Sequence, residues 1–546
     1  MSLFTSRIRP DESMQKIMSI ETFSRKYNSR KIVLFFLVLF LVGSPEMLAR
    51  KKKTPPPTLA QQIEQILNSS SISNGFLGIE VYSVERKKII YAKDAGHLFV
   101  PASNTKLFTT ATALAQLPAD LRFHTTLESS GKIDKFGRLN GDLIFVGRGD
   151  PNLSNRPLPY DPKAPRSAPP LSAIENLVNQ LVARGITTID GDIVGDDSYY
   201  VNEPYGDSWG WDDLIWGYGA PVSALTLNDN VFSLSISPGE AVRDRAFITT
   251  DPFYPSVKLQ NDLITTAPGT ERHVHVDRSP GSNLLHLWGT LPQDAKTDQE
   301  LIAIAEPARL AAETLRDTLR SKGIRVYGDL RVHHREVWEL SPAIAVRPLE
   351  NPKRAVLAEL VSHPLREDLK IIAKASQNLH AEMLLRLLGA QVRGEGSVRA
   401  GLQVEKEFLK EAGVDDKLFL FGDGSGMDPH NLVAPHAVVQ LLSYLWEQPY
   451  RDVFIDLLPV GGVDGTLASR FKGTSLAEKV HAKTGTLTHV NALSGYATPP
   501  SGEHVIFSIL TNNHLQDSKI ATATMDKILE TILTYREPSP KKSGKK

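Results

Sequence analysis

A serine and a lysine one helical turn apart could supply a nucleophile and its base. Ser103 and Lys106 lie in residues 100–117, where Pro101 precedes apolar residues that recur at helical spacing. This pattern places Ser103 at the start of a helix, with Lys106 on the same helix face. A lysine whose pKa is lowered by burial could remove the proton of the serine hydroxyl.

The Ser-x-x-Lys spacing is weak evidence by itself. It recurs at Ser129/Lys132 and at Ser469/Lys472, where no catalytic context surrounds it. On spacing alone, a pair of solvated side chains is the simpler interpretation.

Two further short motifs add groups that could hold or relay a proton. Ser376-Gln-Asn378 offers a hydroxyl and an amide on a stretch with helical periodicity. Lys483-Thr-Gly-Thr486 reads as the edge of a strand, where the glycine permits close approach and the lysine and hydroxyls could bind an anion. Each motif alone is common in chains without this chemistry.

Composition narrows the functional classes. The 546 residues include 62 Lys+Arg and 62 Asp+Glu, so bulk charge gives no argument for nucleic-acid binding. There is no cysteine, which excludes disulfides, thiol catalysis and cysteine-ligated metals. No His-Glu-x-x-His motif or comparable cluster is present, so the sequence predicts neither a metal nor a cofactor.

The order of elements predicts an α+β chain with a long β-rich insertion. Helical periodicity returns after residue 355, and one of the helices it predicts covers Leu357–His363. Near the end, residues 493–497 and 504–510 read as a pair of strands. The middle block, residues 230–291, is almost entirely strand and turn by its pattern.

The N-terminus carries a secretion pattern. Basic residues precede an apolar run of about a dozen residues that follows Lys31 and is too short for a membrane span of about 20 residues. The sequence therefore predicts an exported protein, with residues 1–49 as the leader and 50–58 as a linker. The lysine-rich end, residues 536–546, is predicted to be a disordered basic tail.

The order Ser-x-x-Lys, Ser-x-Asn, Lys-Thr-Gly resembles that of penicillin-binding proteins and serine β-lactamases. Within that group the chain resembles the low-molecular-mass class C penicillin-binding proteins, the D-alanyl-D-alanine carboxypeptidase/endopeptidase family (peptidase family S13). The resemblance extends from about residue 59 to about residue 535. It includes these segments: Gly147–Pro151, Gly191–Asp196, Trp209–Trp211, Ser223–Asn228, Asp423–Gly426, Gly461–Leu467 and Asn491–Tyr496.

This resemblance implies a transpeptidase-like domain, an antiparallel sheet flanked by helices, interrupted by an insertion that forms one or two extra domains. The expected boundaries are residues 59–121 and 351–535 for the catalytic domain, 122–229 and 295–350 for inserted domain II, and 230–294 for inserted domain III.

The resemblance also implies roles for the motif residues. Ser103 would attack the carbonyl between two terminal D-alanines, Lys106 would activate it, and Asn378 would orient Lys106. Ser376 beside Lys483 would pass a proton to the departing amine. The backbone N–H groups of Ser103 and Thr486 would form the oxyanion hole, and Lys483, Thr484, Gly485 and Thr486 would line the site of the substrate carboxylate.

In that family an acidic side chain of the insertion helps to read the third residue of the stem peptide. Asp196, with Tyr200 beside it, is the candidate here, although Asp196 could equally cap a turn.

The expected activity is a serine D-alanyl-D-alanine carboxypeptidase and DD-endopeptidase of the periplasm or cell envelope, associated peripherally with the inner membrane. Its expected partners are peptidoglycan stem peptides, with β-lactams as covalent inhibitors. Two alternatives are a β-lactamase or esterase with the same residues, and a catalytically silent wall-binding protein. Intact motifs argue against the last.

Overall fold

The computed structural model describes residues 57–536 except 71, 73, 162–167, 280 and 342–352. The predicted leader and nearly all of the predicted linker and basic tail fall outside these residues. Within the described part of the chain, no helix combines the length and the apolar character that crossing a bilayer requires.

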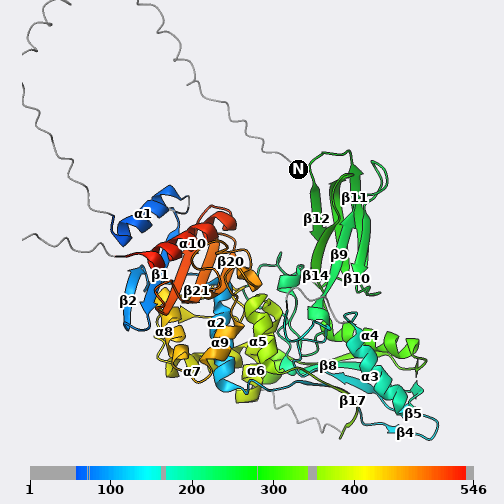
Figure 1. The fold of residues 1–546 in the computed structure, drawn as a ribbon. Helices are drawn as coiled ribbons and strands as arrows, with labels where there is room; N and C mark the ends of the chain where they lie inside the picture. The colour runs from blue at the N-terminus through cyan, green and yellow to red at the C-terminus, as the bar shows by residue number, and fades with distance from the viewer. Residues whose placement is uncertain are drawn as a thin grey trace, which may run out of the picture. The chain divides into compact units, whose positions relative to one another are not determined.

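A five-stranded antiparallel sheet forms the centre of the domain that carries the motifs (Figure 1). Its strands, in spatial order, are β2 (Lys88–Lys93), β1 (Phe76–Ser83), β22 (Val505–Asn512), β21 (Val490–Ala497) and β20 (Val480–Leu487). The predicted pair of strands near the C-terminus is confirmed as β21 and β22. Every residue of these two strands is buried, because helices cover both faces of the sheet.

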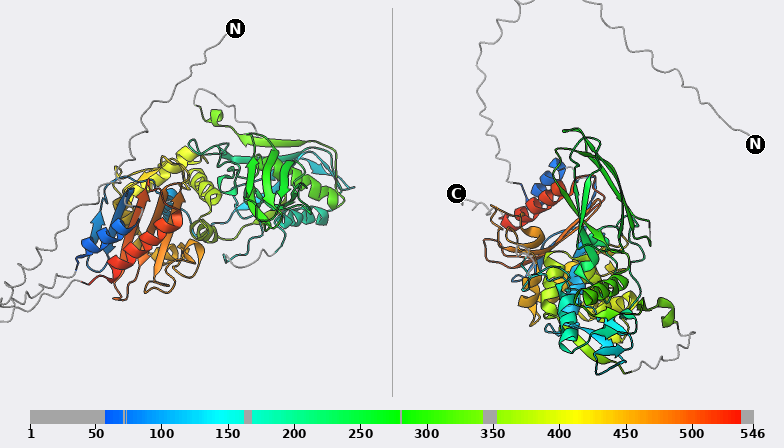
Figure 2. Two further views of the ribbon diagram at one scale, coloured as in Figure 1. Left: turned by 90° about the horizontal axis from the view of Figure 1, so that it is seen from above. Right: turned by 90° about the vertical axis from the view of Figure 1, so that its right-hand side faces the viewer.

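Two helices cover one face of this sheet, α1 (Leu59–Ser69) and α10 (Ser518–Thr534) (Figure 2). The helix α1 begins at a capping box, in which Thr58 and Gln61 satisfy each other's backbone N–H groups. Its apolar stripe, Ile63, Ile66 and Leu67, is buried in the same core as α10.

A group of helices covers the other face. These are α2 (Thr105–Gln116), α5 (Leu365–Lys374), α6 (Asn378–Arg393), α7 (Val398–Glu411), α8 (Pro435–Trp446) and α9 (Arg451–Leu457). The helix α2 is buried around nearly its whole circumference, since α5, α6 and α7 all pack against it. Its small residues, Ala111, Ala113 and four threonines, permit this close packing. Ser103 therefore precedes a helix that its surroundings hold firmly.

The insertion contributes a second five-stranded sheet in the order β16-β8-β6-β3-β17 and a smaller sheet in the order β15-β7-β5-β4. The strands are β3 (His124–Ser129), β4 (Lys132–Ile133), β5 (Arg138–Asn140), β6 (Leu143–Val146), β7 (Thr188–Ile189), β8 (Ile193–Val201), β15 (Arg325–Val326), β16 (Leu330–Arg335) and β17 (Ala355–Val361). The helices α3 (Ser172–Ala183) and α4 (Pro307–Ser321) share its apolar core.

The predicted helix over Leu357–His363 is wrong. Residues 355–361 form the strand β17, which pairs antiparallel with β3. The apolar residues Leu357 and Ala358 enter the core of the insertion sheet instead of a helix face. The second half of the chain thus adds one strand to the insertion before it returns to the helices around α2.

Residues 231–303 form two narrow three-stranded sheets around one apolar core, as the strand-and-turn pattern predicts (Figure 1). One sheet has the order β10-β9-β14, with β9 (Val231–Ser237), β10 (Phe247–Asp251) and β14 (Asp298–Ala303). The other has the order β11-β13-β12, with β11 (Lys258–Thr266), β12 (His273–Asp277) and β13 (Leu284–Pro292).

Short elements complete the described chain. These are the pair β18 (Phe419–Leu420) and β19 (Leu432–Val433), and the 3-10 helices η1 (Ala102–Asn104), η2 (Gly217–Gly219), η3 (Asn228–Asn230), η4 (Val337–Leu340) and η5 (Gly465–Leu467).

Candidate active site

Ser103 lies in η1, just before α2 begins, and two glycines border its backbone. A Cβ on Gly426 would lie 3.0 Å from the Ser103 nitrogen and 1.9 Å from the Ala102 oxygen. A Cβ on Gly485 would lie 3.1 Å from the same nitrogen and 2.5 Å from the Pro101 oxygen. Only residues without a side chain fit at these positions, so the strand β20 and the loop of Gly426 can approach the serine closely.

Lys106 is buried and faces Ser103 from the next turn. Its Nζ lies 2.8 Å from Ser103 Oγ, 2.7 Å from Asn378 Oδ1 and 2.6 Å from the Ser425 carbonyl oxygen. Burial lowers the pKa of Lys106 to about 7, although the negative charges of Asp423 and Glu382 act in the opposite direction.

A neutral Lys106 suits this set of partners. A neutral amine has two protons, which it can donate to Asn378 Oδ1 and to the Ser425 carbonyl. Its lone pair then faces Ser103 Oγ and can accept the hydroxyl proton. Near neutral pH, this geometry makes Lys106 a base in contact with the serine.

The loop that supplies the Ser425 carbonyl is itself held by buried carboxylates. Glu382 Oε1 accepts from the backbone N–H groups of Gly424 and Ser425 at 3.0 and 2.8 Å. Asp423 Oδ1 accepts from Gly426 N at 2.8 Å, and its Oδ2 accepts from Trp209 Nε1 of the insertion at 3.1 Å. These bonds fix the direction of the carbonyl that faces Lys106.

Ser376 and Lys483 form a second pair of hydroxyl and amine. Ser376 lies in the short turn between α5 and α6 and has a φ of 59°, a left-handed conformation that is uncommon for a residue with a side chain. Lys483, on β20, donates to Ser376 Oγ at 2.8 Å and to the Thr484 carbonyl at 2.8 Å. Burial, and then the positive charge of Lys106, hold the pKa of Lys483 well below its ordinary value.

The strand β20 lies at the edge of the central sheet, so the side of it away from β21 can pair with a substrate backbone. Thr484 Oγ1 donates to Thr466 Oγ1 at 2.8 Å, and Thr486 is exposed and accepts from Asn491 Nδ2 at 3.2 Å. The structure thus brings the predicted residues together beside β20. They are Ser103, Lys106, Ser376, Asn378, Lys483, Thr484, Gly485 and Thr486.

Asp196 and Tyr200 do not join this cluster. Asp196 is 3% exposed on β8, and its carboxylate lies 3.0 Å from Arg354 Nη1 and 3.2 Å from His333 Nδ1. Tyr200 is buried in the apolar core that surrounds α2, and its ring packs against Tyr199. A carboxylate that is buried and already paired is not available to an incoming ammonium group.

Sequence reasoning missed the segment of the insertion that does reach the cluster. Asn378 Nδ2 donates to the Tyr218 carbonyl at 3.0 Å, which turns Asn378 Oδ1 toward Lys106. The Tyr218 hydroxyl donates to Asp213 Oδ1 at 2.8 Å. Tyr218 is 51% exposed, so its ring and the carboxylate bonded to it lie at the surface next to Asn378. Trp211, in the same segment, is 71% exposed. The nearby Trp-Gly-Trp pattern was its only signal in the sequence.

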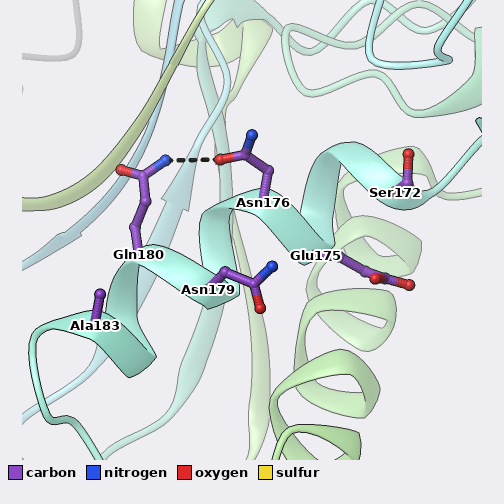
Figure 3. Close-up of a pocket in the computed structure, with 6 residues that line it drawn as sticks. All are labelled: Ser172, Glu175, Asn176, Asn179, Gln180 and Ala183. Atoms are coloured by element: carbon purple, nitrogen blue, oxygen red, sulfur yellow. Dashed lines mark hydrogen bonds between the residues drawn. The ribbon is translucent and has the colours of Figure 1, made fainter.

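A hollow on the insertion surface lies along α3 and is lined by Ser172, Glu175, Asn176, Asn179, Gln180 and Ala183 (Figure 3). Gln180 donates to Asn176 Oδ1 at 3.1 Å and to the backbone of β17 at 2.9 Å. These bonds stabilise the insertion. The residues that line the hollow do not include a serine–lysine pair. Among the residues that the structure describes, no group of three or more His, Asp or Glu side chains could hold a metal ion.

The fold and the two serine–lysine pairs define a class of protein, the serine enzymes that share the penicillin-binding fold. The model of the D-Ala-D-Ala carboxypeptidase 3 (S13) family matches residues 59–532, and the chain belongs to this family. The chain is therefore a serine-type D-alanyl-D-alanine carboxypeptidase by family.

Individual relatives agree. A D-alanyl-D-alanine carboxypeptidase from Actinomadura sp. (strain R39) is 33% identical, over 89% of this chain and 86% of that protein. The D-alanyl-D-alanine carboxypeptidase DacB from Haemophilus influenzae is 27% identical, over 84% of this chain and 90% of that protein.

A solved structure also confirms the predicted fold class. The crystal structure of penicillin binding protein 4 (dacB) from Haemophilus influenzae matches with a TM-score of 0.75 at 24% identity, covering 87% of this chain and 99% of that one.

Proposed function

We propose that the chain cleaves the bond between two terminal D-alanines of peptidoglycan stem peptides, through an acyl-enzyme on Ser103. The observation that carries this proposal is the position of Lys106 Nζ, buried and 2.8 Å from Ser103 Oγ. A substrate bound along β20 would present its carbonyl to Ser103 and its terminal carboxylate to Lys483, Thr484 and Thr486.

The first step forms an ester. Ser103 Oγ attacks the carbonyl carbon while its proton passes to Lys106 Nζ, and the backbone N–H groups of Ser103 and Thr486 stabilise the negative oxygen. The carbon–nitrogen bond then breaks, and the departing amine of D-alanine takes a proton through Ser376 Oγ, which lies 2.8 Å from Lys483 Nζ. The substrate carboxylate favours the charged form of Lys483, which this proton transfer uses.

The second step releases the peptide. Water attacks the ester carbonyl and passes a proton through Ser376 Oγ back to Lys483, and Ser103 Oγ leaves with the proton that Lys106 holds. The shortened peptide gives its remaining proton to solvent and departs as a carboxylate. When the amine that leaves belongs to a neighbouring stem peptide, the same two steps open a cross-link, so we also propose DD-endopeptidase activity. A penicillin would acylate Ser103 in the same way.

We propose that Asp213, and not Asp196, recognises the third residue of the stem peptide. Asp213 is half-buried and bonded to the hydroxyl of Tyr218, the residue whose carbonyl accepts from Asn378. A free ammonium group on the third side chain of the substrate would pair with this carboxylate. Asp213→Asn should lower kcat/KM several-fold on a peptide with that ammonium and leave a short acyl-D-Ala-D-Ala analogue unaffected. Equal losses on both substrates would contradict this assignment.

The test of the function is incubation with purified muropeptides, followed by mass analysis. Release of D-alanine from pentapeptides supports carboxypeptidase activity, and conversion of cross-linked dimers to monomers supports endopeptidase activity. Rapid hydrolysis of penicillin without either product would favour the β-lactamase alternative, and no acylation at all would favour a silent wall-binding protein. Peptidoglycan lies in the cell envelope, so we propose that the enzyme acts there. Export and peripheral association with the membrane remain predictions from the sequence.

A further inference from the structure

A buried cluster of charged groups connects the insertion to the turn that carries Ser376 and Asn378. On α6, His380 is fully buried, with Nδ1 2.6 Å from Asp368 Oδ1 and Nε2 3.2 Å from Asp229 Oδ1. Arg156 of the insertion donates to the other oxygen of Asp229. Gln377 Nε2 also donates to that oxygen, at 3.3 Å. Of these residues, Gln377 alone belongs to a sequence motif, as the variable middle residue of Ser376-Gln-Asn378.

We propose that Asp229 is a positioning residue for the reaction, because through Gln377 and His380 it holds Ser376 and Asn378 in their working geometry. Asp229 belongs to the insertion, so the insertion has a role in acyl transfer itself as well as in recognition. This inference rests on the proposed roles of Ser376 and Asn378, which Ser376→Ala and Asn378→Ala test separately in the same acylation assay.

The backbone at Asp229 indicates that its position matters. Asn228, Asp229 and Asn230 have φ angles of 49°, 55° and 54°, three consecutive left-handed residues with side chains. Such conformations cost free energy and persist where the surroundings impose them. Side-chain bonds on both sides impose this one: Asn228 donates to the Val231 carbonyl at 2.7 Å, and Asn230 donates to the Pro221 carbonyl at 2.9 Å.

The turn that Asp229 contacts is equally unusual. Ser376 has a φ of 59°, and the next residue, Gln377, caps α6 by accepting from the Leu379 N–H at 3.0 Å. Gln377 thus uses its oxygen for the helix and its nitrogen for Asp229. His380 lies two residues after Asn378, so Asp229 contacts the chain on both sides of the catalytic amide.

The charged groups of the cluster act on one another. Burial lowers the pKa of His380, but the adjacent carboxylates of Asp368 and Asp229 outweigh it and hold that pKa at about 9. Arg156 and then His380 hold the pKa of Asp229 far below its ordinary value, against the effect of burial. Arg156 and His380 therefore face Asp229 and Asp368, with the buried Asp150 close enough to act on His380, and loss of one charge would leave a buried partner unpaired.

The test exchanges the donor and the acceptor between Asp229 and Gln377. In Asp229→Asn, the new amide nitrogen faces a donor, either the Gln377 amide nitrogen or Arg156, so a hydrogen bond is lost. In Gln377→Glu, one carboxylate oxygen still accepts from Leu379 N–H, but the other faces the carboxylate of Asp229 and is repelled by it. In the double variant, the amide nitrogen at position 229 can donate to the carboxylate at position 377, and that carboxylate keeps a negative charge in the cluster. Each protein is acylated with labelled penicillin at several concentrations, which separates the maximal acylation rate from the dissociation constant of the preceding complex.

We expect each single variant to lower the maximal acylation rate by about tenfold or more, because small displacements of catalytic groups have effects of this size. The dissociation constant should change far less, and the double variant should recover most of the rate. Rescue of the rate is a result that a merely structural role would not give.

Asp526→Asn is the matched control. It removes the carboxylate from another partly buried pair, with Arg470, on the helix α10. It should reduce the melting temperature and leave the acylation rate unchanged. Parent-like acylation of Gln377→Glu, or a double variant no faster than the slower single variant, would overturn the proposal. If Asp229→Asn does not fold, Gln377→Glu at the half-exposed turn decides the question alone.

Discussion

Replacing Asn378 with aspartate should change the pH at which Ser103 is acylated. The amide oxygen of Asn378 lies 2.7 Å from Lys106 Nζ, so Asn378→Asp puts a negative charge in direct contact with the proposed base. An opposite charge at this distance raises a lysine pKa by about 1–3 units. Since only the neutral amine accepts the serine proton, a higher pKa moves the rising limb of acylation to higher pH.

The magnitude follows from the position of Lys106. Burial brings its pKa from 10.5 to about 7, so about half of the molecules carry a neutral Lys106 at pH 7. With the pKa raised by about 1–3 units, acylation at pH 7 should fall about 5- to 500-fold and recover toward pH 10.

The assay is the second-order rate of labelling by a fluorescent penicillin between about pH 5.5 and 10, a range that covers the titration of the parent and of the variant. Asn378→Ala is the matched control, because it removes the same hydrogen bond without adding a charge, and its midpoint should stay near that of the parent. If Asn378→Asp is slow but keeps the parent midpoint, Lys106 is not the group whose titration limits acylation.

Two further predictions concern the close approach of β20 and the buried cluster. Gly485→Ala places a Cβ 2.5 Å from the Pro101 oxygen and 3.1 Å from the Ser103 nitrogen, so β20 must move away from the serine. The rate of penicillin labelling should fall by about 100-fold or more, as it does when an enzyme loses an oxyanion-hole donor. A normal rate of labelling would show that β20 can move without harm. His380, with its pKa raised from 6.5 to about 9, contributes stability that is fully present below about pH 6.5 and is lost as pH rises through about 9. The difference in unfolding free energy between the parent and His380→Gln, measured in urea, should therefore shrink across that window by up to about 1.4 kcal/mol per pH unit, and a constant difference would contradict a charged His380.

Local spacing is sufficient to predict the first half of the site. Lys106 follows Ser103 by three positions, and a helix brings such positions onto one face, where the structure has them 2.8 Å apart. Lys483 and Ser376 are 107 positions apart, and no periodicity predicts that they meet; only the resemblance to a family does so.

The remaining contacts depend on how distant segments pack. Tyr218 and Asp229 reach the site because the insertion lies against α6, and neither residue carries a motif of its own. Asp196 is an acidic residue in a family-like segment, but its partner Arg354 follows 158 positions later and occupies it. Likewise, residues 355–361 have helix-compatible spacing, and pairing with β3 decides their structure instead.

The central claim is that Ser103 is the nucleophile and that its acylation depends on Lys106. The most direct measurement is mass mapping of the intact enzyme after reaction with penicillin. We predict one adduct, on the peptide that contains Ser103, and none in Ser103→Ala. An adduct on Ser376 or Ser425 of the parent enzyme would contradict the account.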